Sequence, residues 1–233
     1  MPIVLNAETK SYSYPGLDIT RMNFSSEGMP WGKRLIRTLK AIKSEYILFF
    51  LEDFWLDAPV DNEYFEYIFS EFKKNEDVAV IYFQPTPRPG NVDDGRFERF
   101  ERRYQKGAYR MNCQAALWRK DKLIESLQPH ESAWEWENYG TIRSYKRTYS
   151  VYAIKEDAPP VFSYEVDQGG VIHRGKWNAD AVKPLADKHG LKIDYSIRGF
   201  ETWPLEKRKD SYLTRFKRQA NRRLRYIKYK YFD

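Results

Sequence analysis

The segment that most constrains the fold is YILFFL (46–51), six consecutive apolar or aromatic residues followed directly by Glu52 and Asp53. It is too short to span a membrane and lacks helical spacing, so it predicts a β-strand buried on both faces, as in a parallel sheet covered by helices. Ligands bind outside the carboxyl ends of strands in open α/β sheets. Two carboxylates there suit a metal or a sugar hydroxyl. The alternative is that they cap the turn or pair with a basic neighbour.

Short apolar segments alternate with amphipathic ones along the chain, which predicts a layered α/β domain. The charged stretch 91–110 predicts a surface excursion over one sheet edge, and 169–177 predicts a glycine-punctuated loop. Asp61 is expected to cap a helix whose buried stripe is Tyr64, Phe65, Ile68, Phe69 and Phe72. The other expected helices are 31–43, 119–127, 130–147 beginning near Ser132, and 179–190. The other expected strands are 78–84, 111–118, 149–154 and 160–166. Near the N-terminus, 3–5 and 17–19 are expected to be two short strands, or one strand and an extended arm.

The length of 233 residues is enough for one α/β domain with a sizeable core. The single cysteine, Cys113, excludes an intrachain disulfide and fits a reducing compartment. No run approaches the ~18 apolar residues of a membrane-spanning helix, and no signal peptide opens the chain. We therefore expect a soluble, cytoplasmic protein whose membrane contact, on the inner face of the cell membrane, is peripheral.

The net charge of +7 is concentrated at the carboxyl end. Residues 207–233 carry eleven Lys or Arg and two Asp, whereas residues 1–206 hold 29 bases and 31 acids. We therefore divide the chain into a domain, 1–206, and a basic amphipathic helix, 207–233, which predicts contact with an anionic membrane surface. The alternative is a helix packed on its own domain with solvated charges. The apolar stripe of this helix is Leu213, Phe216, Ala220, Leu224, Ile227 and Tyr231.

The segment PHESAWEWENYG (129–140) interleaves Trp134 and Trp136 with Glu135 and Glu137. Aromatic faces beside carboxylates suit carbohydrate, because the C–H face of a sugar packs on an indole while the acids accept its hydroxyl protons. A glutamate in a partly apolar pocket can have a raised pKa and act as a general base. The alternative is a helix with core tryptophans and solvated glutamates.

Two further motifs contain polar groups that suit a ligand. In HRGKW (173–177), Arg174 and Lys176 offer cations for a diphosphate and His173 can ligate a metal, although solvated bases and a structural histidine are the alternative. In NCQAALWR (112–119), polar side chains enter an apolar segment and must serve either a ligand or a loop backbone. Cys113 is expected to be a small core residue and not a nucleophile.

Taken together and in this order, these motifs resemble a bacterial glycosyltransferase family of the GT-A type, found in polysaccharide and lipopolysaccharide gene clusters. The resemblance extends from about Pro2 to Phe200 and rests on LEDFW, NCQAALWRKDKL, HESAWEWENYGTIR, GGVIHRGKW and IDYSIRGF. It implies a Rossmann-like, mixed and mostly parallel sheet flanked by helices. It also implies a hexosyltransferase that uses a nucleotide-diphosphate sugar, often with Mn²⁺ or Mg²⁺, and a glycan or lipid-linked acceptor.

The resemblance also implies roles for individual residues. Asp53 would hold a metal that bridges the donor diphosphate, and Glu52 would lie near the ribose or donor sugar. If the enzyme inverts the anomeric configuration, Glu137 would deprotonate the acceptor hydroxyl, with Glu135 as its nearest competitor. Gln114 would contact the donor or hold the pocket wall. The sugar pocket would include Trp118, Trp134 and Trp136, and the groups closing on the diphosphate would be His173, also a candidate metal ligand, Arg174 and Lys176.

Two departures from the family pattern leave other functions open. The strand-end motif is Glu-Asp-Phe and not Asp-x-Asp, and family members usually carry an additional βα unit before the segment that matches PIVLNAETKSY. A catalytically weak or inactive relative that binds sugar, nucleotide or a partner is therefore one alternative. A nucleic-acid-binding protein using the basic tail is another. The slightly acidic body and the lack of a zinc, RRM-like or helix-turn-helix signature disfavour it, so no nucleic acid is expected as a partner.

Overall fold

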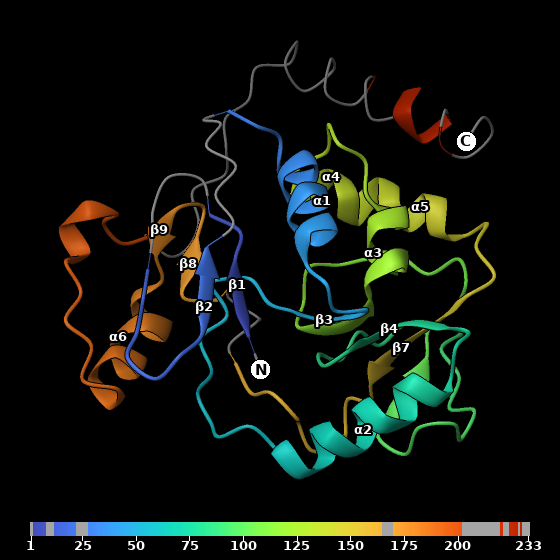
Figure 1. Ribbon diagram of the computed structural model, residues 1–233, viewed down its shortest axis with the longest axis horizontal. Helices are drawn as coiled ribbons and strands as arrows, with labels where there is room; N and C mark the ends of the chain where they lie inside the picture. The colour runs from blue at the N-terminus through green and yellow to red at the C-terminus, as the bar shows by residue number, and fades with distance from the viewer. Residues whose placement is uncertain are drawn as a thin grey trace.

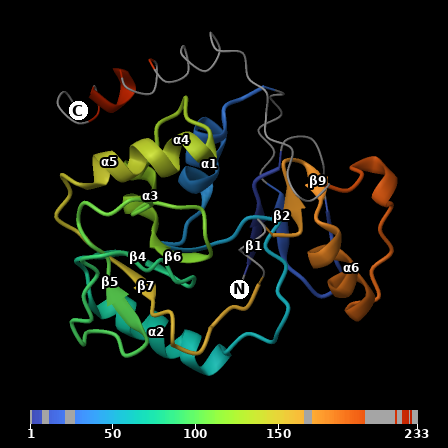
Figure 2. The ribbon, with the colours of Figure 1, turned by 180° about the vertical axis from the view of Figure 1, so that it is seen from behind.

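The computed structural model describes residues 2–7, 12–21, 28–164, 170–201, 220, 224–227 and 229. Its centre is a five-stranded sheet in the order β3-β6-β4-β7-β5, with helices on both faces (Figures 1 and 2). The strands of this sheet are β3 (Tyr46–Phe49), β4 (Val78–Tyr82), β5 (Phe100–Arg102), β6 (Ala116–Arg119) and β7 (Ser150–Ile154).

The sheet is mixed, and its strand directions correct one expectation from the sequence. Only β4 and β7 pair in parallel, whereas β3–β6, β6–β4 and β7–β5 are antiparallel pairs. The expected mostly parallel sheet is therefore wrong at the level of neighbouring strands. β3 also differs from expectation, because it forms an edge of the sheet and is half-buried, whereas β4 is the strand that is buried throughout.

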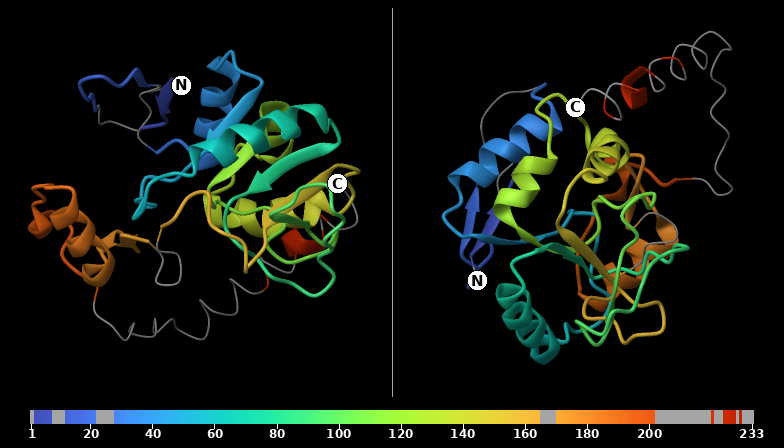
Figure 3. Two further views of the ribbon diagram at one scale, coloured as in Figure 1. Left: turned by 90° about the horizontal axis from the view of Figure 1, so that it is seen from below. Right: turned by 90° about the vertical axis from the view of Figure 1, so that its right-hand side faces the viewer.

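Helices cover both faces of the sheet and divide the core into two layers. On one face lie α1 (Trp31–Ala41), α3 (Lys120–Ser126) and a helical stretch formed by α4 (Ala133–Glu135), the π-helix η1 (Trp136–Gly140) and α5 (Thr141–Ser144). On the other face lies α2 (Asn62–Lys74). In the left view of Figure 3, which looks at the molecule from below, α2 crosses in front of the sheet. As expected, Asp61 caps α2 by accepting a hydrogen bond of 3.1 Å from the Tyr64 amide.

Smaller elements lie to one side of the main sheet, beyond the end of β3 (Figures 1 and 2). The strands β1 (Ile3–Leu5) and β2 (Ile19–Arg21) pair in parallel. β8 (Ile172–His173) and β9 (Lys176–Trp177) form a hairpin, which packs with α6 (Ala179–Lys188) and the 3₁₀-helix η2 (Tyr195–Ile197) around a small core.

Four local expectations are corrected by the structure. Segment 160–166 is not a strand over its described part, where Tyr164 makes only an isolated bridge with Leu56. The loop expected at 169–177 contains a hairpin, because Arg174 and Gly175 both have positive φ and form a two-residue turn that suits the strand twist. β6 begins only at Ala116, and the single helix expected at 130–147 is interrupted by the π-helical turn.

The expected C-terminal helix, 207–233, lies mostly outside the described residues. The parts that are described, 220, 224–227 and 229, are helical. Among the described residues, none of the helices combines the length and apolar character that a membrane crossing requires.

Candidate functional site

The candidate site is built at one edge of the main sheet, where several chain segments meet. β6 runs antiparallel to both β3 and β4, and Ala116 at its start pairs with Phe49 and with Tyr82 at their ends. The residues before β6 therefore lie at the same edge as the residues that follow β3 and β4. This geometry brings 112–115 toward the acidic pair Glu52 and Asp53.

Asp53 has a carboxylate whose surroundings leave it unsatisfied. Its Oδ1 atom is buried and has no hydrogen-bond partner among the described residues. Burial, and then the neighbouring charge of exposed Glu52, raise the pKa of Asp53 to about 6. A buried carboxylate oxygen without a partner is costly, so this atom is a suitable ligand for a cation or a hydroxyl.

The backbone at Asp53 anchors the start of the β8–β9 hairpin. The Asp53 carbonyl accepts a hydrogen bond of 3.1 Å from the Val171 amide. Gly170 has a φ of +77°, and a Cβ atom there would lie 2.7 Å from the Asp53 carbonyl oxygen. Glycine is therefore required for this close approach. Arg174 and Lys176 are both exposed on the β8–β9 hairpin, whose start is anchored to the Asp53 backbone.

Glu137 lies on the π-helical turn and points toward the loop before β6. Its Oε1 atom accepts a hydrogen bond of 2.8 Å from the Cys113 amide. Burial raises the pKa of this half-buried carboxyl group. π-helical turns are frequent at functional sites. Here Gly140 permits the turn, since a Cβ atom at that position would lie 2.8 Å from the Trp136 ring.

Cys113 lies near both carboxylates. Its thiol is buried, and its pKa is raised by that burial, then by the charge of Glu137 and then by that of Asp53. The thiol therefore stays protonated and acts as a small core residue. Both carboxylates are therefore close enough to Cys113 to raise its pKa, although 84 positions separate Asp53 and Glu137 in the sequence.

Tyr164 completes this site and was not identified from the sequence. Its hydroxyl accepts a hydrogen bond of 3.0 Å from the Ala115 amide and donates one of 3.0 Å to Gln114 Oε1. Its ring stacks on Phe54 with the centroids 4.7 Å apart. The one available signal was a tyrosine in an apolar segment, since a buried hydroxyl needs a partner. The side chain of Gln114 is thus held in place by Tyr164.

Asn112 supports the loop backbone. Its side-chain oxygen accepts a hydrogen bond of 3.0 Å from the backbone amide of Gln114. The backbone amide of Asn112 donates a hydrogen bond of 3.1 Å to the Tyr82 hydroxyl. Of the two roles that the sequence left open for this residue, the structure shows the contact with the loop backbone.

Three of the other predicted site residues do not suit the roles expected for them. Two are buried tryptophans, and the third is a glutamate held by other contacts. Trp118 and Trp136 have no exposed surface and pack against each other in the core, so neither can contact a sugar. Glu135 forms a capping box with Ser132 and an ion pair with Arg225. Although burial opposes the shift, hydrogen bonds from Ser132 and Arg225 lower the pKa of Glu135, which makes it a weak base. Trp134, by contrast, is 76% exposed.

The predicted metal ligands do not form a complete protein cage. His173 Nδ1 lies 3.7 Å from Glu201 Oε2. In the described part of the chain, no group of three or more His, Cys, Asp and Glu side chains is arranged to hold a metal. Asp53 with its unsatisfied oxygen fits a single ligand. That suffices for Mg²⁺, which is commonly bound through one or two carboxylates together with substrate phosphates.

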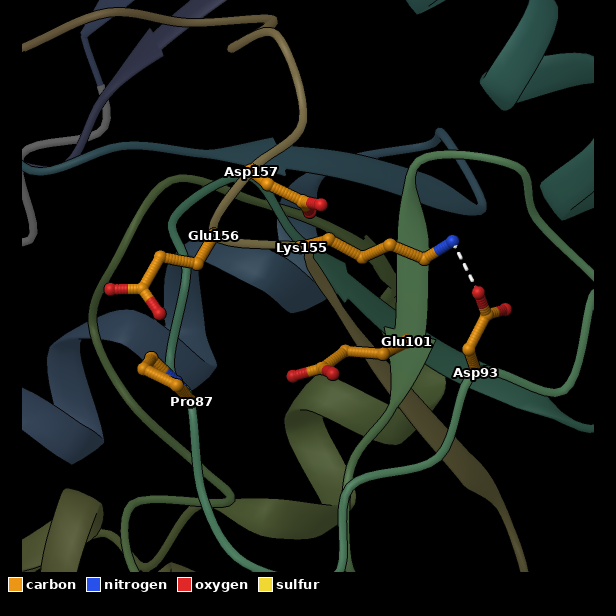
Figure 4. Close-up of a pocket in the computed structure, with 6 residues that line it drawn as sticks. All are labelled: Pro87, Asp93, Glu101, Lys155, Glu156 and Asp157. Carbon is orange, nitrogen blue, oxygen red and sulfur yellow. Dashed lines mark ion pairs between the residues drawn. The ribbon is translucent and has the colours of Figure 1, made fainter.

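A pocket of about 430 Å³ lies at the β5 side of the sheet, and none of its lining residues belongs to the candidate site (Figure 4). In this pocket Lys155 pairs with Asp93 at 2.5 Å. Its lining residues are Pro87, Asp93, Glu101, Lys155, Glu156 and Asp157. Four acids and one base make this pocket unsuitable for an anionic diphosphate.

Comparisons with known proteins do not identify a family. No protein-family model matches the chain, and no curated protein matches it. Among solved structures, the chain is similar to S. aureus TarS 1-349, with 15% sequence identity and a TM-score of 0.42. The match covers 61% of this chain and 42% of the TarS chain, so it spans less than half the length of that protein. At this TM-score the likeness carries no argument about function.

Proposed function

We propose that this chain is a glycosyltransferase that moves a sugar from a nucleotide-diphosphate sugar to a hydroxyl of a glycan or lipid-linked acceptor, in the cytoplasm, for cell-surface polysaccharide synthesis. The observation that carries the proposal is that two carboxylates with different surroundings lie near Cys113. Asp53 has an unsatisfied buried oxygen at the sheet edge, and Glu137 has a raised pKa on a π-helical turn. One suits a cation bound to the donor, and the other suits a general base.

In this proposal the acceptor hydroxyl oxygen attacks the anomeric carbon of the donor sugar. The bond between that carbon and the diphosphate oxygen breaks, and the nucleoside diphosphate leaves with the electron pair. Glu137 takes the hydroxyl proton, which is the role of the general base in an inverting transfer. The Cys113 amide holds the carboxylate in place by donating to Oε1. A raised pKa brings the base closer to neutral pH, where proton transfer is most efficient.

The negative charge of the diphosphate must be offset by positive charge. In this proposal the positive charge comes from a cation held by Asp53 and from the side chains of Arg174 and Lys176. Asp53 would hold a divalent cation, Mn²⁺ or Mg²⁺, which stabilises charge on the leaving group. Arg174 and Lys176 are exposed on the β8–β9 hairpin, which is anchored to the Asp53 backbone, so they can approach the phosphates. Gln114, held by Tyr164, would contact the donor, and exposed Trp134 would offer an aromatic face to the acceptor sugar.

Thermal-shift measurements with UDP-, GDP-, CMP- and dTDP-sugars, each with and without Mn²⁺, test the donor site. We expect one nucleotide to stabilise the wild type in a Mn²⁺-dependent manner and Asp53→Asn to lose that effect. Glu137→Gln should keep the donor-induced shift and lose transfer. Donor binding without turnover in the wild type would indicate an inactive relative. The absence of a shift with every donor would overturn the proposal.

A further inference from the structure

The C-terminal helix is attached to the molecule through one of its faces. Tyr229 is 3% exposed, and its hydroxyl lies 3.2 Å from His130 Nε2. Its ring centroid lies 5.3 Å from that of Tyr139, and Arg225 forms an ion pair with Glu135. Figure 2 shows this helical segment, drawn in red, above α5. Arg225 and Tyr229 therefore hold the helix against the stretch that carries Glu137.

The opposite face of this helix presents apolar side chains to solvent. Leu224 is 66% exposed and Ile227 is 46% exposed. With about 3.6 residues per turn, these two residues share a face nearly opposite to that of Arg225 and Tyr229. The docking contacts thus use a basic and an aromatic residue and leave the aliphatic pair uncovered. This arrangement differs from a helix that buries its apolar stripe against its own domain.

The charges around the exposed pair indicate what it contacts. The sequence RRLRYIKYK (222–230) contains five bases and no acid. Basic residues beside exposed aliphatic side chains match an anionic bilayer, whose headgroups attract the bases while the aliphatic groups enter the acyl boundary. Nucleic acid offers phosphates but does not require exposed aliphatic side chains.

We propose that the face formed by Leu224 and Ile227 is a docking surface for an anionic lipid bilayer. Arg225 and Tyr229 fix the orientation of this surface relative to the domain. Since the bound helix is the neighbour of α4 and η1, docking would place the bilayer on the side of the molecule that carries these elements. The proposal does not depend on the proposed transferase activity and is tested without a substrate.

The test is co-sedimentation of the full chain with phosphatidylcholine vesicles prepared with and without phosphatidylglycerol. We expect salt-sensitive binding that requires phosphatidylglycerol. The double variant Leu224→Ser/Ile227→Ser should bind at least about tenfold more weakly, because it loses the aliphatic area that enters the bilayer. The matched control is Leu191→Ser/Ile197→Ser, which removes two exposed aliphatic side chains elsewhere and should bind as the wild type does.

Several results would overturn this proposal. One is wild-type binding by the Leu224→Ser/Ile227→Ser variant, and another is equal binding of the wild type to vesicles without phosphatidylglycerol. A concentration-dependent dimer in size-exclusion chromatography that this variant abolishes would assign the face to a second copy. Salt-dependent binding to an oligonucleotide, unchanged in the variant and displacing vesicles, would assign the basic segment to nucleic acid.

Discussion

The Cys113 amide donates a hydrogen bond of 2.8 Å to Oε1 of Glu137, which joins the loop before β6 to the π-helical turn. The contact holds one carboxylate oxygen in place and points the side chain toward the sheet edge where Asp53 lies. The Glu135 carboxylate, two positions earlier, accepts hydrogen bonds from the backbone amide and the hydroxyl of Ser132 instead. Two glutamates that look equivalent in the sequence therefore have different surroundings.

This difference predicts opposite effects of the same substitution at the two positions. Glu137→Gln should abolish transfer without loss of donor binding, because an amide cannot take the acceptor proton. Glu135→Gln should retain transfer and lower the free energy of unfolding by about 1 kcal/mol, the usual cost of a weakened helix cap. Turnover with the identified donor, together with urea unfolding, measures both effects. Unchanged turnover in Glu137→Gln would remove this residue from the role of base.

The raised pKa of Glu137 also predicts a pH-dependent change in stability. In the unfolded chain the carboxyl group has an ordinary pKa near 4.5, and burial raises it in the folded protein. The ionised form therefore destabilises the folded state above the folded-state pKa, and this cost disappears below the unfolded-state pKa. Glu137→Gln avoids the cost and can still accept the Cys113 hydrogen bond through its amide oxygen.

We accordingly expect Glu137→Gln to unfold at a higher temperature than the wild type at about pH 8, with the difference shrinking toward about pH 4. Thermal unfolding followed by circular dichroism across this range measures the effect. A difference between the two proteins that stays constant with pH would show that the carboxyl group of Glu137 does not titrate differently on folding.

Two glycines with nearly the same backbone conformation should respond differently to alanine. Gly170 and Gly175 both have positive φ, but only Gly170 lies against the Asp53 carbonyl, and a Cβ atom at Gly175 meets open space. Gly175→Ala should cost about 1–2 kcal/mol from backbone strain alone. Gly170→Ala should cost more, because the 2.7 Å approach to a backbone oxygen forces the chain apart.

Denaturant unfolding of both variants measures this comparison, and the donor-induced thermal shift provides a second measurement. Because Gly170 contacts the Asp53 backbone, Gly170→Ala should also weaken the donor-induced shift, whereas Gly175→Ala should weaken it less. Equal losses of stability in the two variants would contradict the close approach of Gly170 to Asp53.

A buried ion pair supports the helical stretch that carries Glu137. Both oxygens of fully buried Glu131 accept hydrogen bonds of 2.7 Å from Arg143, which also donates to the Ser126 carbonyl at 2.8 Å. Glu131→Gln leaves the buried guanidinium without a charge partner and should cost about 3–5 kcal/mol. Urea unfolding measures the loss.

The control for this substitution is Glu125→Gln, which breaks an exposed pair with Arg147. That change should lower the stability by less than about 1 kcal/mol, because solvent screens an exposed pair. A loss in Glu131→Gln no larger than in this control would show that the buried pair contributes little to the fold.

The local structure was predictable wherever it depends on neighbours in the sequence. Spacing of apolar residues predicted α1 and α2, and Asp61 was recognised as a cap because capping needs only the next three residues. Gly190 ends α6 with a positive φ, as its position after the helical spacing indicated. Asp53 and Glu137 were also selected as candidate site residues from their local motifs.

The tertiary structure decided which of these residues meet. The direction of β6, and hence the approach of Cys113 to Asp53, depends on pairing with β3 and β4. The burial of Trp118 and Trp136 and the contact of Tyr164 with Gln114 depend in the same way on distant segments. Periodicity describes one segment against an average environment, whereas strand pairing and burial are properties of several segments packed together.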